Sequence, residues 1–530
     1  MKYDEALQRA GSYGNYQKFL ICLLAIPAIF NATTTQVLNF IVGNHLHRCK
    51  YLITNDSAYY DIENANNTFS LYINNTNQCV ITTNGTETAC TEWIYDKTVY
   101  QSTLISKFDI VCDDRFMRSN VLLAYFLGQM FSAFTYGLIS DIWGRKPVII
   151  TGVIVLFVSN VISRWMSNVY LVCVCQFFNS VGGVYHYVVS FILAAELVGP
   201  DKRIMASFIL YIAYCIGEYI LLVEAYFVRR WENLMLVISI PIAVCFFTFP
   251  YFVESPRWLF MKGRNKQAIE ILQKAAKYNQ ISVDFTAETI VVKKEETISI
   301  TTGIKTMMKS RQMLFRSLIL ILNWMAVNLI YYGISLNIGD LAGNVYINYA
   351  ISSTAETIAV IFCFFSDKFP RKRLFCSSMI IGGCSCLCTL FTSTFGGNSL
   401  QWLTIMLAMV GKLCVSTAFF LIYVITAEIF PTIIRATAFS FCDMGGRIGS
   451  ISSSYIGKLG VLVDTRFGQA LPLIIFGSVG TLAGLLAIFL PETGKTKLPD
   501  TVQEAIHTVR ESKHSSPINS KPCEENETML

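Results

Sequence analysis

The sequence predicts an all-α membrane protein whose helices cross the bilayer twelve times, in two bundles of six. Hydrophobic residues make up 53% of the 530 residues and charged residues only 15%, whereas a soluble chain carries roughly a quarter charged residues. The apolar residues are collected in stretches of about 20, the length that a helix needs to cross a membrane. Short charged motifs recur at matched positions, which divides the chain into two related halves.

Twelve apolar stretches are the predicted spans. The first is expected to remain in the protein and to direct insertion, because four charged residues precede a long apolar run without a clear cleavage site. The spans are expected at residues 18–40, 120–140, 148–166, 170–193, 204–227, 233–252, 314–335, 346–366, 374–392, 402–426, 437–456 and 470–490.

The spans divide the chain into four regions. Residues 1–253 form an amino-terminal bundle that includes a long loop at 41–119. A central segment at 254–311 joins it to a carboxy-terminal bundle at 312–492. The tail at 493–530 is polar and is expected to be disordered.

The central segment is expected to begin with helices. Pro256 follows Glu254 and Ser255, an order typical of a helix start. From Lys262 to Tyr278, apolar residues recur at helical spacing among charged ones. We expect this amphipathic helix to lie along the membrane surface.

Basic residues in short loops set the predicted orientation. They fall on the same side of the membrane as both termini and the central segment, and the positive-inside rule makes that side the cytoplasm. Both termini are therefore expected in the cytoplasm, and the protein is expected in the plasma membrane. The basic residues are Arg145, Lys146, Lys202, Arg203, Lys368, Arg371, Lys372, Arg373 and Arg435.

The loop at 41–119 then faces outward, and its composition agrees. Its glycosylation sequons begin at Asn55, Asn66, Asn74 and Asn84. Four cysteines in the loop can form two disulfides in an oxidising compartment, with three possible pairings. These cysteines are Cys49, Cys79, Cys90 and Cys112.

One charged motif occupies matched turns in both halves. Asp141 precedes Arg145 between the second and third spans, and Asp367 precedes Arg371 between the eighth and ninth. An Asp that ends one helix and an Arg that begins the next can pair where the membrane meets water. We expect these residues to form latches that break and re-form.

A second motif repeats where the fourth and tenth spans end. Glu196 precedes Arg203, and Glu428 precedes Arg435, by seven residues in each case. A proline inside each motif favours a bend that aims these residues at the Asp–Arg motif of the same half. We expect the complete set of charges to hold the outward-open state of a carrier. The repetition resembles the major facilitator superfamily, whose halves are parallel repeats.

More specific motifs resemble solute carrier family 22, the organic cation, carnitine and organic anion transporters. They are the large first loop, GLISDIWGRKP at 137–147, ESPRWL at 254–259, AEIFPT at 427–432 followed by Arg435, and LPET at 490–493. The resemblance covers residues 1–510 and implies the major facilitator fold and transport by alternating access. Residues 329–341 look closest to the carnitine and zwitterion carriers.

Some positions depart from the family pattern. Ile142 replaces a base in the first latch, and Pro370 replaces a glycine in the second. Gln176 and Ser180 stand where the superfamily usually has Arg and Gly on the fourth span. The loss of that Arg puts in doubt any proton coupling built on it.

Ionisable residues inside spans are functional candidates, because they are costly in a bilayer unless they face a cavity or a partner. The position of Arg447 resembles one that holds Arg in the anion and carnitine carriers of the family and Asp in its typical cation carriers. Its planar fork suits a substrate carboxylate. The alternative is an internal pair with Asp443, one turn earlier.

Three further charges join this site. Glu356 matches a cavity-facing Glu of the family and either attracts a cation or pairs with Lys412 or Arg447. Lys412 is a second anion contact or a salt-bridge partner. Glu218 and Glu224 are six residues apart on the fifth span, so at most one points inward, and Glu218 is preferred because Glu224 lies near the outer surface.

Aromatic rings complete the predicted substrate site. Tyr331 and Tyr187 match cavity positions of the family, and rings of this kind hold quaternary ammonium groups through cation–π contact. A site that offers both Arg447 and Glu356 favours a zwitterion. The expected function is therefore secondary transport of small organic ions, most of all zwitterions or carnitine-like solutes, with the direction of net flux open. An organic anion exchanger, a polyspecific cation facilitator, and a non-transporting receptor or scaffold on a carrier fold stay open.

Other function classes have no support in the sequence. No zinc pattern, dinucleotide-binding glycine run or nucleophile motif is present, so an enzyme is not expected. No organic cofactor or nucleic-acid partner is implied, and the coupling ion, sodium or proton, is open. Membrane lipid is one expected partner. The terminal residues 527–530 also match a ligand for a PDZ scaffold.

Overall fold

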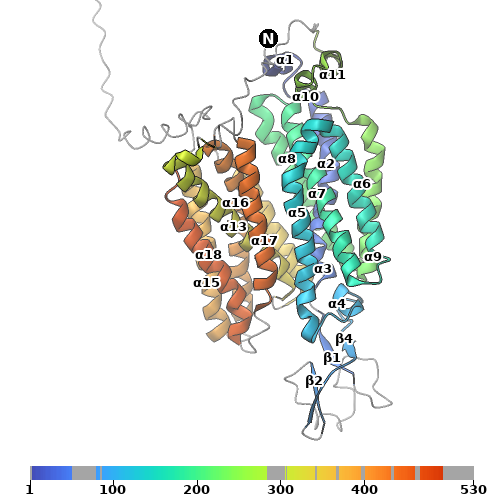
Figure 1. Cartoon of the computed structure of the whole chain (residues 1–530), viewed down its shortest axis with the longest axis vertical. Coiled ribbons are helices and arrows are strands. Elements are labelled where there is room, and N and C mark those ends of the chain that lie inside the picture. The colour runs from blue at the N-terminus through green and yellow to red at the C-terminus, as the bar shows by residue number, and fades with distance from the viewer. Residues whose placement is uncertain are drawn as a thin grey trace, which may run out of the picture.

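The computed structural model describes residues 3–43, 45–50, 79–83, 86–282, 305, 307–340, 343–365, 369–395, 400–430, 435–459 and 466–492. Its long helices form two bundles that stand side by side (Figure 1). The first bundle contains α2 (Asn15–Gln36), α5 (Met117–Trp143), α6 (Arg145–Ser163), α7 (Val169–Leu197), α8 (Arg203–Phe227) and α9 (Trp231–Val244). The second contains α13 (Arg311–Leu336), α14 (Val345–Phe364), α15 (Arg371–Phe395), α16 (Gln401–Ile429), α17 (Arg435–Ile456) and α18 (Arg466–Ala487).

The helices agree with the predicted spans to within a few residues, apart from the sixth. There α9 ends at Val244, and the chain continues as a 3-10 helix, η4 (Cys245–Tyr251). Pro241 lies inside α9 and Pro250 inside η4. Because proline removes a backbone donor, the regular α-helix is not sustained over this span.

Eleven of the described helical segments are long and apolar enough to cross a membrane. The predicted span at 437–456 is not among them, although α17 has 22 residues. Its sequence is rich in Gly and Ser and includes Asp443 and Arg447, which lowers its hydropathy. It packs against α13 of its own bundle and α5 of the other. A polar helix is tolerated there because its polar side faces protein rather than lipid.

Glycines allow the same close helix packing in both bundles. A Cβ atom on Gly182 of α7 would lie 2.7 Å from the Gly152 carbonyl oxygen of α6. In the second bundle a Cβ atom on Gly383 of α15 would lie 2.8 Å from the Gly477 carbonyl oxygen of α18. Small residues let membrane helices approach at backbone contact. These glycines therefore fix α6–α7 and α15–α18 as tight pairs.

Short helices gather at one end of the bundles, here called the α1 end (Figure 1). They are α1 (Tyr3–Arg9), α10 (Pro256–Met261), which begins at Pro256 as predicted, and α11 (Asn265–Tyr278). The apolar face of α11 is buried against α10 and α1. This differs from the expected contact with the membrane surface, because Trp258 and Phe260 of α10 and Leu7 of α1 cover that face.

Asn279 ties the start of the chain to the segment that follows the sixth span. Its amide nitrogen donates to the Ala10 carbonyl at 2.9 Å and to Gln17 Oε1 at 2.9 Å. Its amide oxygen accepts a bond of 3.0 Å from the Tyr16 backbone nitrogen. One side chain thus holds the segment before α2 and the first turn of α2 against the end of α11.

The opposite end, here called the strand end, carries most of the described part of the long loop. β1 (His47–Cys49) pairs with β4 (Trp93–Tyr95), and β2 (Val80–Thr83) pairs with β3 (Thr86–Ala89), both antiparallel. The remaining elements here are α3 (Leu38–Ile41), α4 (Leu104–Lys107) and two 3-10 helices, η2 (Cys112–Phe116) and η5 (Ile338–Asp340). Asn55, Asn66, Asn74 and Asn84 lie outside the described residues.

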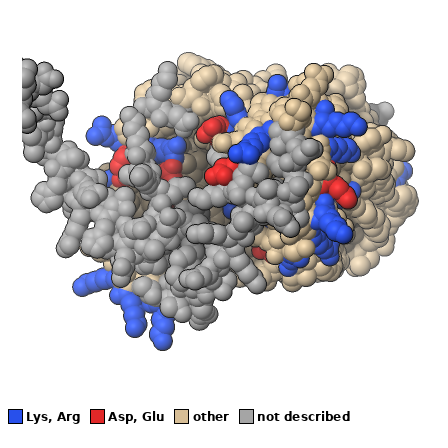
Figure 2. Space-filling view, turned by 90° about the horizontal axis from the view of Figure 1, so that it is seen from above, with Lys and Arg blue, Asp and Glu red and all other residues tan. Residues whose placement is uncertain are grey.

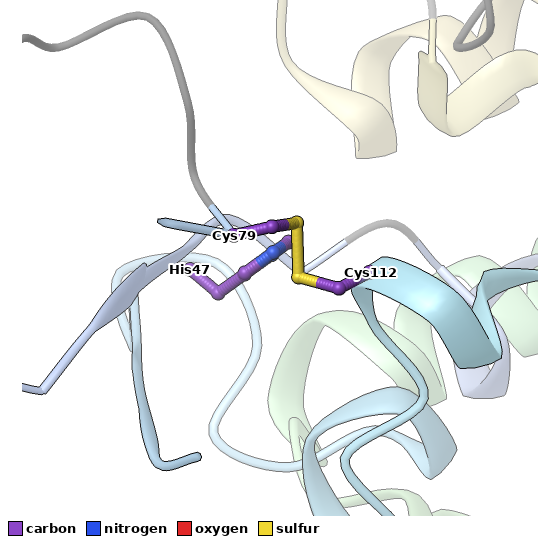
Figure 3. A group of neighbouring side chains, drawn as sticks. All are labelled: His47, Cys79 and Cys112. Carbon is purple, nitrogen blue, oxygen red and sulfur yellow. A yellow bond between two sulfur atoms is a disulfide. The ribbon is translucent and has the colours of Figure 1, made fainter. Parts of the chain in front are cut away.

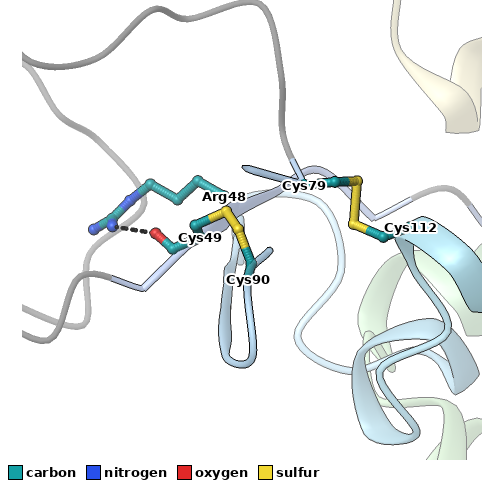
Figure 4. The surroundings of a disulfide bond; sticks show 5 residues. All are labelled: Arg48, Cys49, Cys79, Cys90 and Cys112. Carbon is teal, nitrogen blue, oxygen red and sulfur yellow. Dashed lines mark hydrogen bonds between the residues drawn. A yellow bond between two sulfur atoms is a disulfide. The ribbon is translucent and has the colours of Figure 1, made fainter. Parts of the chain in front are cut away.

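The structure resolves the disulfide pairing that the sequence left open. Cys49 is joined to Cys90, and Cys79 to Cys112 (Figure 4). Beside the first bridge, Arg48 donates to the Cys49 carbonyl at 3.2 Å. The His47 ring lies against the second bridge (Figure 3). Both sulfur atoms there are joined, so neither is free as a thiolate ligand for a metal.

The pairing can be tested by labelling. In a Cys49→Ser variant on intact cells, a membrane-impermeant maleimide is expected to label Cys90, because that residue alone loses its bridge. Tryptic peptides analysed by mass spectrometry identify the labelled residue. The matched control, Cys79→Ser, should expose Cys112. Label on Cys79 or Cys112 in the Cys49→Ser variant would contradict the pairing.

Candidate functional site

Glu356 and Lys412 form an ion pair inside the second bundle. The Glu356 carboxylate on α14 lies 3.0 Å from the Lys412 ammonium on α16, and each side chain is 1% exposed. Tyr331 of α13 donates its hydroxyl to the same carboxylate, at 2.7 Å and 2.8 Å from its two oxygens. Three of the predicted site residues are therefore brought together, and they join three helices.

Lys412 is fully satisfied at this position. Besides the carboxylate, its ammonium donates to the Ser335 hydroxyl at 2.7 Å and lies 3.5 Å from the centre of the Tyr331 ring. A charge at this depth requires such partners, because a bare ammonium in a bilayer costs several kcal/mol. The sequence left open whether Glu356 and Lys412 contact a substrate or pair with each other. In the structure they form a salt bridge with each other.

Arg447 forms a second charged group between the bundles. Its guanidinium lies 2.9 Å from the Asp443 carboxylate, one turn earlier on α17. On its other side it donates a 2.6 Å bond to the Gln129 side chain of α5, in the first bundle. The Arg447 Nε has no hydrogen-bond partner within the described residues. The predicted internal pair with Asp443 is present, and the guanidinium also bridges the two bundles.

Two adjacent tyrosines of α13 stand between the charged groups. Tyr331 serves the Glu356 carboxylate, while the Tyr332 ring packs edge-on against Phe126 of α5, with centroids 4.8 Å apart. Tyr332 is also among the groups that interact with Arg447. Because successive residues of a helix point about 100° apart, one turn of α13 reaches toward both groups.

Glu218 belongs to the first bundle and has a different environment. It lies on α8, is 2% exposed, and accepts a 2.8 Å bond from the Gln36 amide of α2. The Gln36 side chain in turn accepts from Asn39 at 3.0 Å. Glu224, in contrast, is only partly buried and lies one turn from the end of α8 at Phe227. The preference for Glu218 as the inward acid agrees with this placement.

Tyr187 lies on α7, and its described contacts are made by its aromatic ring. Its ring packs against Phe191 at 5.0 Å and against Tyr214 of α8 at 5.5 Å between centroids. Its electrostatic neighbours include Glu356 and Glu218. The tyrosine is therefore placed near both acids, from the side of the first bundle.

The first predicted latch is formed at the α1 end. Arg145 lies 3.0 Å from Asp141 and donates to both oxygens of Glu196, at 3.2 Å and 3.3 Å. Arg203, the fourth residue of the predicted set in this half, donates from its Nε to the Ala195 carbonyl at 3.2 Å, next to Glu196. Glu196 therefore lies against the Asp141–Arg145 motif, as the sequence predicted.

The second latch repeats the arrangement. Arg371 forms an ion pair with Glu428. Asp367 lies outside the described residues, and so does the side chain of Arg435. In both latches the described pairs join helices of one bundle. They brace α5–α7 and α15–α16 internally, and the expectation that they hold the outward-open state stays a prediction.

Glu254 and Glu492 are part of these latches and were missed. The Glu254 carboxylate, which follows η4, accepts from the backbone nitrogens of Arg145 at 2.8 Å and Lys146 at 3.2 Å. Glu492, which follows α18, accepts from the backbone nitrogen of Lys372 at 3.2 Å. Each acid lies at a helix N-terminus, where the helix dipole favours a negative charge. Their occurrence after the sixth and twelfth spans was the available signal.

Burial raises the pKa of the Glu254 carboxyl above its ordinary value, while the bonds from the backbone amides favour its charged form. The carboxylate also sits beside Gly144, whose φ of +106° and ψ of +166° place it in a region that only glycine occupies readily. A Cβ atom there would lie 2.3 Å from Glu254 Oε2.

These features define a membrane carrier built from two six-helix bundles with charged groups at their interface. The chain belongs to the family described as Sugar (and other) transporter, whose model matches residues 57–501. It is a multi-pass membrane transporter and not an enzyme.

Relatives match over nearly the whole chain. The organic cation transporter-like protein of Drosophila melanogaster is 27% identical over 95% of this chain and 92% of its own length. The human organic cation/carnitine transporter 2 is 27% identical over 97% of this chain and 95% of its own. The beta-alanine transporter of Drosophila melanogaster is 27% identical over 95% and 89%, respectively. The resemblance to solute carrier family 22 is confirmed.

The fold is also confirmed by a solved structure. The inward open xylose transporter XylE from E. coli superposes with a TM-score of 0.63, at 15% identity, over 93% of this chain and the whole of that one. At this identity the match speaks for the major facilitator fold alone.

Replacing Gly144 tests the glycine turn of the first latch. Gly144→Ala is expected to destabilise the protein by about 1–3 kcal/mol, because the new methyl group forces both the backbone and Glu254 to move. The melting temperature in detergent measures this. Gly137→Ala on α5 is the control, since a Cβ atom there meets nothing within 4 Å. Equal melting temperatures for the two variants would refute the strain at Gly144.

Removing one member of the buried pair tests its energetics. Lys412→Met is expected to destabilise the fold by about 3–5 kcal/mol, because it leaves the Glu356 carboxylate without a countercharge. The double variant Lys412→Met/Glu356→Gln should recover much of this loss. Thermal unfolding in detergent of the double variant and of both single variants, Lys412→Met and Glu356→Gln, is the measurement. A double variant as unstable as the sum of the two single ones would show that the residues do not act as a pair.

Proposed function

We propose that the chain is a plasma-membrane carrier of small zwitterionic organic ions of the carnitine type. The observation that carries this proposal is the position of Arg447, whose guanidinium lies between the bundles with Asp443 on one side and Gln129 of the other bundle on the other. A substrate carboxylate can take the place of Asp443 on this fork, because Arg presents two parallel donors. The names of two relatives, a carnitine and a beta-alanine transporter, support a zwitterion.

The other end of the substrate would lie toward the second charged group. Glu356 and the rings of Tyr331 and Tyr187 supply a carboxylate and aromatic faces, which attract an ammonium group. In the described state Lys412 occupies that place over the Tyr331 ring. A substrate ammonium would therefore compete with Lys412, much as its carboxylate competes with Asp443.

The contacts between the bundles support alternating access. At the strand end, Phe40 stacks on Tyr346 and packs on Tyr349 of α14, with ring centroids 5.9 Å and 5.0 Å apart. Ser119 of α5 donates to the Ser454 carbonyl of α17 at 2.9 Å, and Tyr455 donates to Asn120 at 2.8 Å. These contacts join the two bundles at the strand end. They would have to separate for a solute to enter from that side.

The orientation follows from the distribution of charge. Lys and Arg side chains are prominent on the face at the α1 end (Figure 2). The positive-inside rule assigns that end to the cytoplasm and the strand end to the outside. The two disulfides at the strand end support this assignment, because disulfides persist in oxidising compartments. A PDZ scaffold at the carboxyl terminus remains a proposal on sequence alone.

Uptake by variants at Arg447 tests the proposed function. Arg447→Gln is expected to raise the KM for carnitine about 10- to 100-fold, since charge-assisted hydrogen bonds are worth about 1.5–3 kcal/mol. Arg447→Lys should recover only part of this, because it lacks the fork. Asp443→Asn should change the KM in the opposite direction, because it frees the guanidinium. Uptake of labelled carnitine into proteoliposomes gives these values.

Two further probes separate the related functions. Tetraethylammonium lacks a carboxylate, and its uptake should be weaker than that of carnitine and should not depend on Arg447. A dicarboxylate should be a poor substrate. If carnitine uptake is indifferent to Arg447→Gln while surface expression is normal, the guanidinium does not bind the substrate.

A further inference from the structure

We propose that Glu218 is the proton site that couples solute transport to a pH gradient. This inference rests on the proposed function. Its basis is a carboxyl group that is buried at the bundle interface, has one oxygen without a hydrogen bond, and forms no ion pair with a Lys or Arg among the described residues.

Of the charged groups that lie together at the centre of the interface, Glu218 is the one without a described ion pair. Arg447 is neutralised by Asp443, and Lys412 by Glu356. Glu218 has only the amide of Gln36 on one oxygen, and its Oε2 has no hydrogen-bond partner within the described residues. An isolated carboxylate at this depth is strongly disfavoured, and such a group takes up a proton instead of remaining charged.

The groups around Glu218 do not offer another route to neutrality. From α2 it meets the Gln36 amide, which does not titrate and which is itself bonded to Asn39 of α3. Lys412 acts on it from the second bundle, but the ammonium is already in contact with Glu356, which repels a second negative charge. The titratable groups that interact with it are Glu356, Lys412, Tyr349, Tyr331, Tyr187, Tyr214 and Cys215.

A proton is the simplest ion for this site, because it needs only the carboxyl oxygen, whereas a hard metal cation needs several oxygen ligands at once. The direct hydrogen bond of the Glu218 carboxyl comes from the N–H donor of Gln36. The Ser353 hydroxyl of α14 also interacts with it across the interface. One proton on Oε2 removes the charge and turns the oxygen without a partner into a donor.

The location of Glu218 supplies the coupling. It stands on α8, while Tyr349, Ser353 and Glu356 stand on α14, and α8 packs against α14 across the bundle interface. Rocking of the bundles would separate these helices and admit water to the carboxyl group. The proton would then be held in the closed arrangement and released in the open one. A ligand that binds two states unequally shifts the equilibrium between them.

Proteoliposomes test the proposal, with the membrane potential clamped by potassium and valinomycin. An inward proton gradient should drive accumulation of carnitine by up to about tenfold per pH unit if one proton moves with each solute. The readout is the ratio of accumulation with and without the gradient. This ratio should fall to one in Glu218→Gln. It should be retained in Glu224→Gln, the same substitution six residues along α8.

Two results would overturn the proposal. One is a gradient response that persists in Glu218→Gln. The other is accumulation by the wild type that follows a sodium gradient at constant pH and ignores the proton gradient. Either result would assign the coupling to another ion or another residue.

Infrared spectroscopy of the purified protein provides a readout that needs no substrate. The wild type minus Glu218→Gln difference spectrum at neutral pH should contain the carbonyl band of a protonated carboxyl group. A carboxylate band in its place would refute the proton site. If the protonated band is present but the wild type moves no carnitine, the proposed substrate is wrong and the proton site stands.

Discussion

A charge inside a bilayer must be neutralised by a partner, and this constraint organises the interior of the molecule. Glu356, Lys412 and Tyr331 stand on α14, α16 and α13, so neutralising one charge ties three helices together. Arg447 satisfies the same requirement with Asp443 on its own helix and also donates a hydrogen bond to Gln129 on α5. The contacts that make these charges tolerable also connect the helices around the site.

The two bundles share a scaffold but not a site. Both use glycines to press two helices together, both form an Arg–Glu pair at the α1 end, and both place a carboxylate after the last helix on the backbone nitrogens of their third helix. The interior charges are distributed differently. The second bundle holds two balanced pairs, whereas Glu218 is the acid of the first bundle at the described site. Duplication thus accounts for the helix packing and the latches that the bundles share, and later divergence accounts for their different interior charges.

Much of this could be predicted from the sequence, for reasons that are local. Helix positions follow from runs of apolar residues, and the aim of Glu196 and Glu428 follows from a motif that occurs twice. The role of Glu254 was missed because its bonds go to backbone nitrogens, which leave no trace in residue identity. The choice between substrate contact and internal pair at Arg447, and the disulfide pairing, depend on three-dimensional distances. For α11 the pattern predicted an apolar face correctly but not that α1 and α10 would cover it.

The bonds of Asn279 have a consequence for synthesis at the ribosome. The segment before α2 is made first, yet its partner in the folded protein is translated more than 250 residues later. The bonds to Asn279 therefore form only after the sixth span has been inserted and α11 has emerged, whereas the bond from Tyr3 to the Glu196 carbonyl can form earlier. Once Asn279 has been translated, its bonds join the beginning and the end of the amino-terminal half of the sequence before the second bundle has been made. Nascent chains that extend just beyond residue 282 already contain both partners of these bonds.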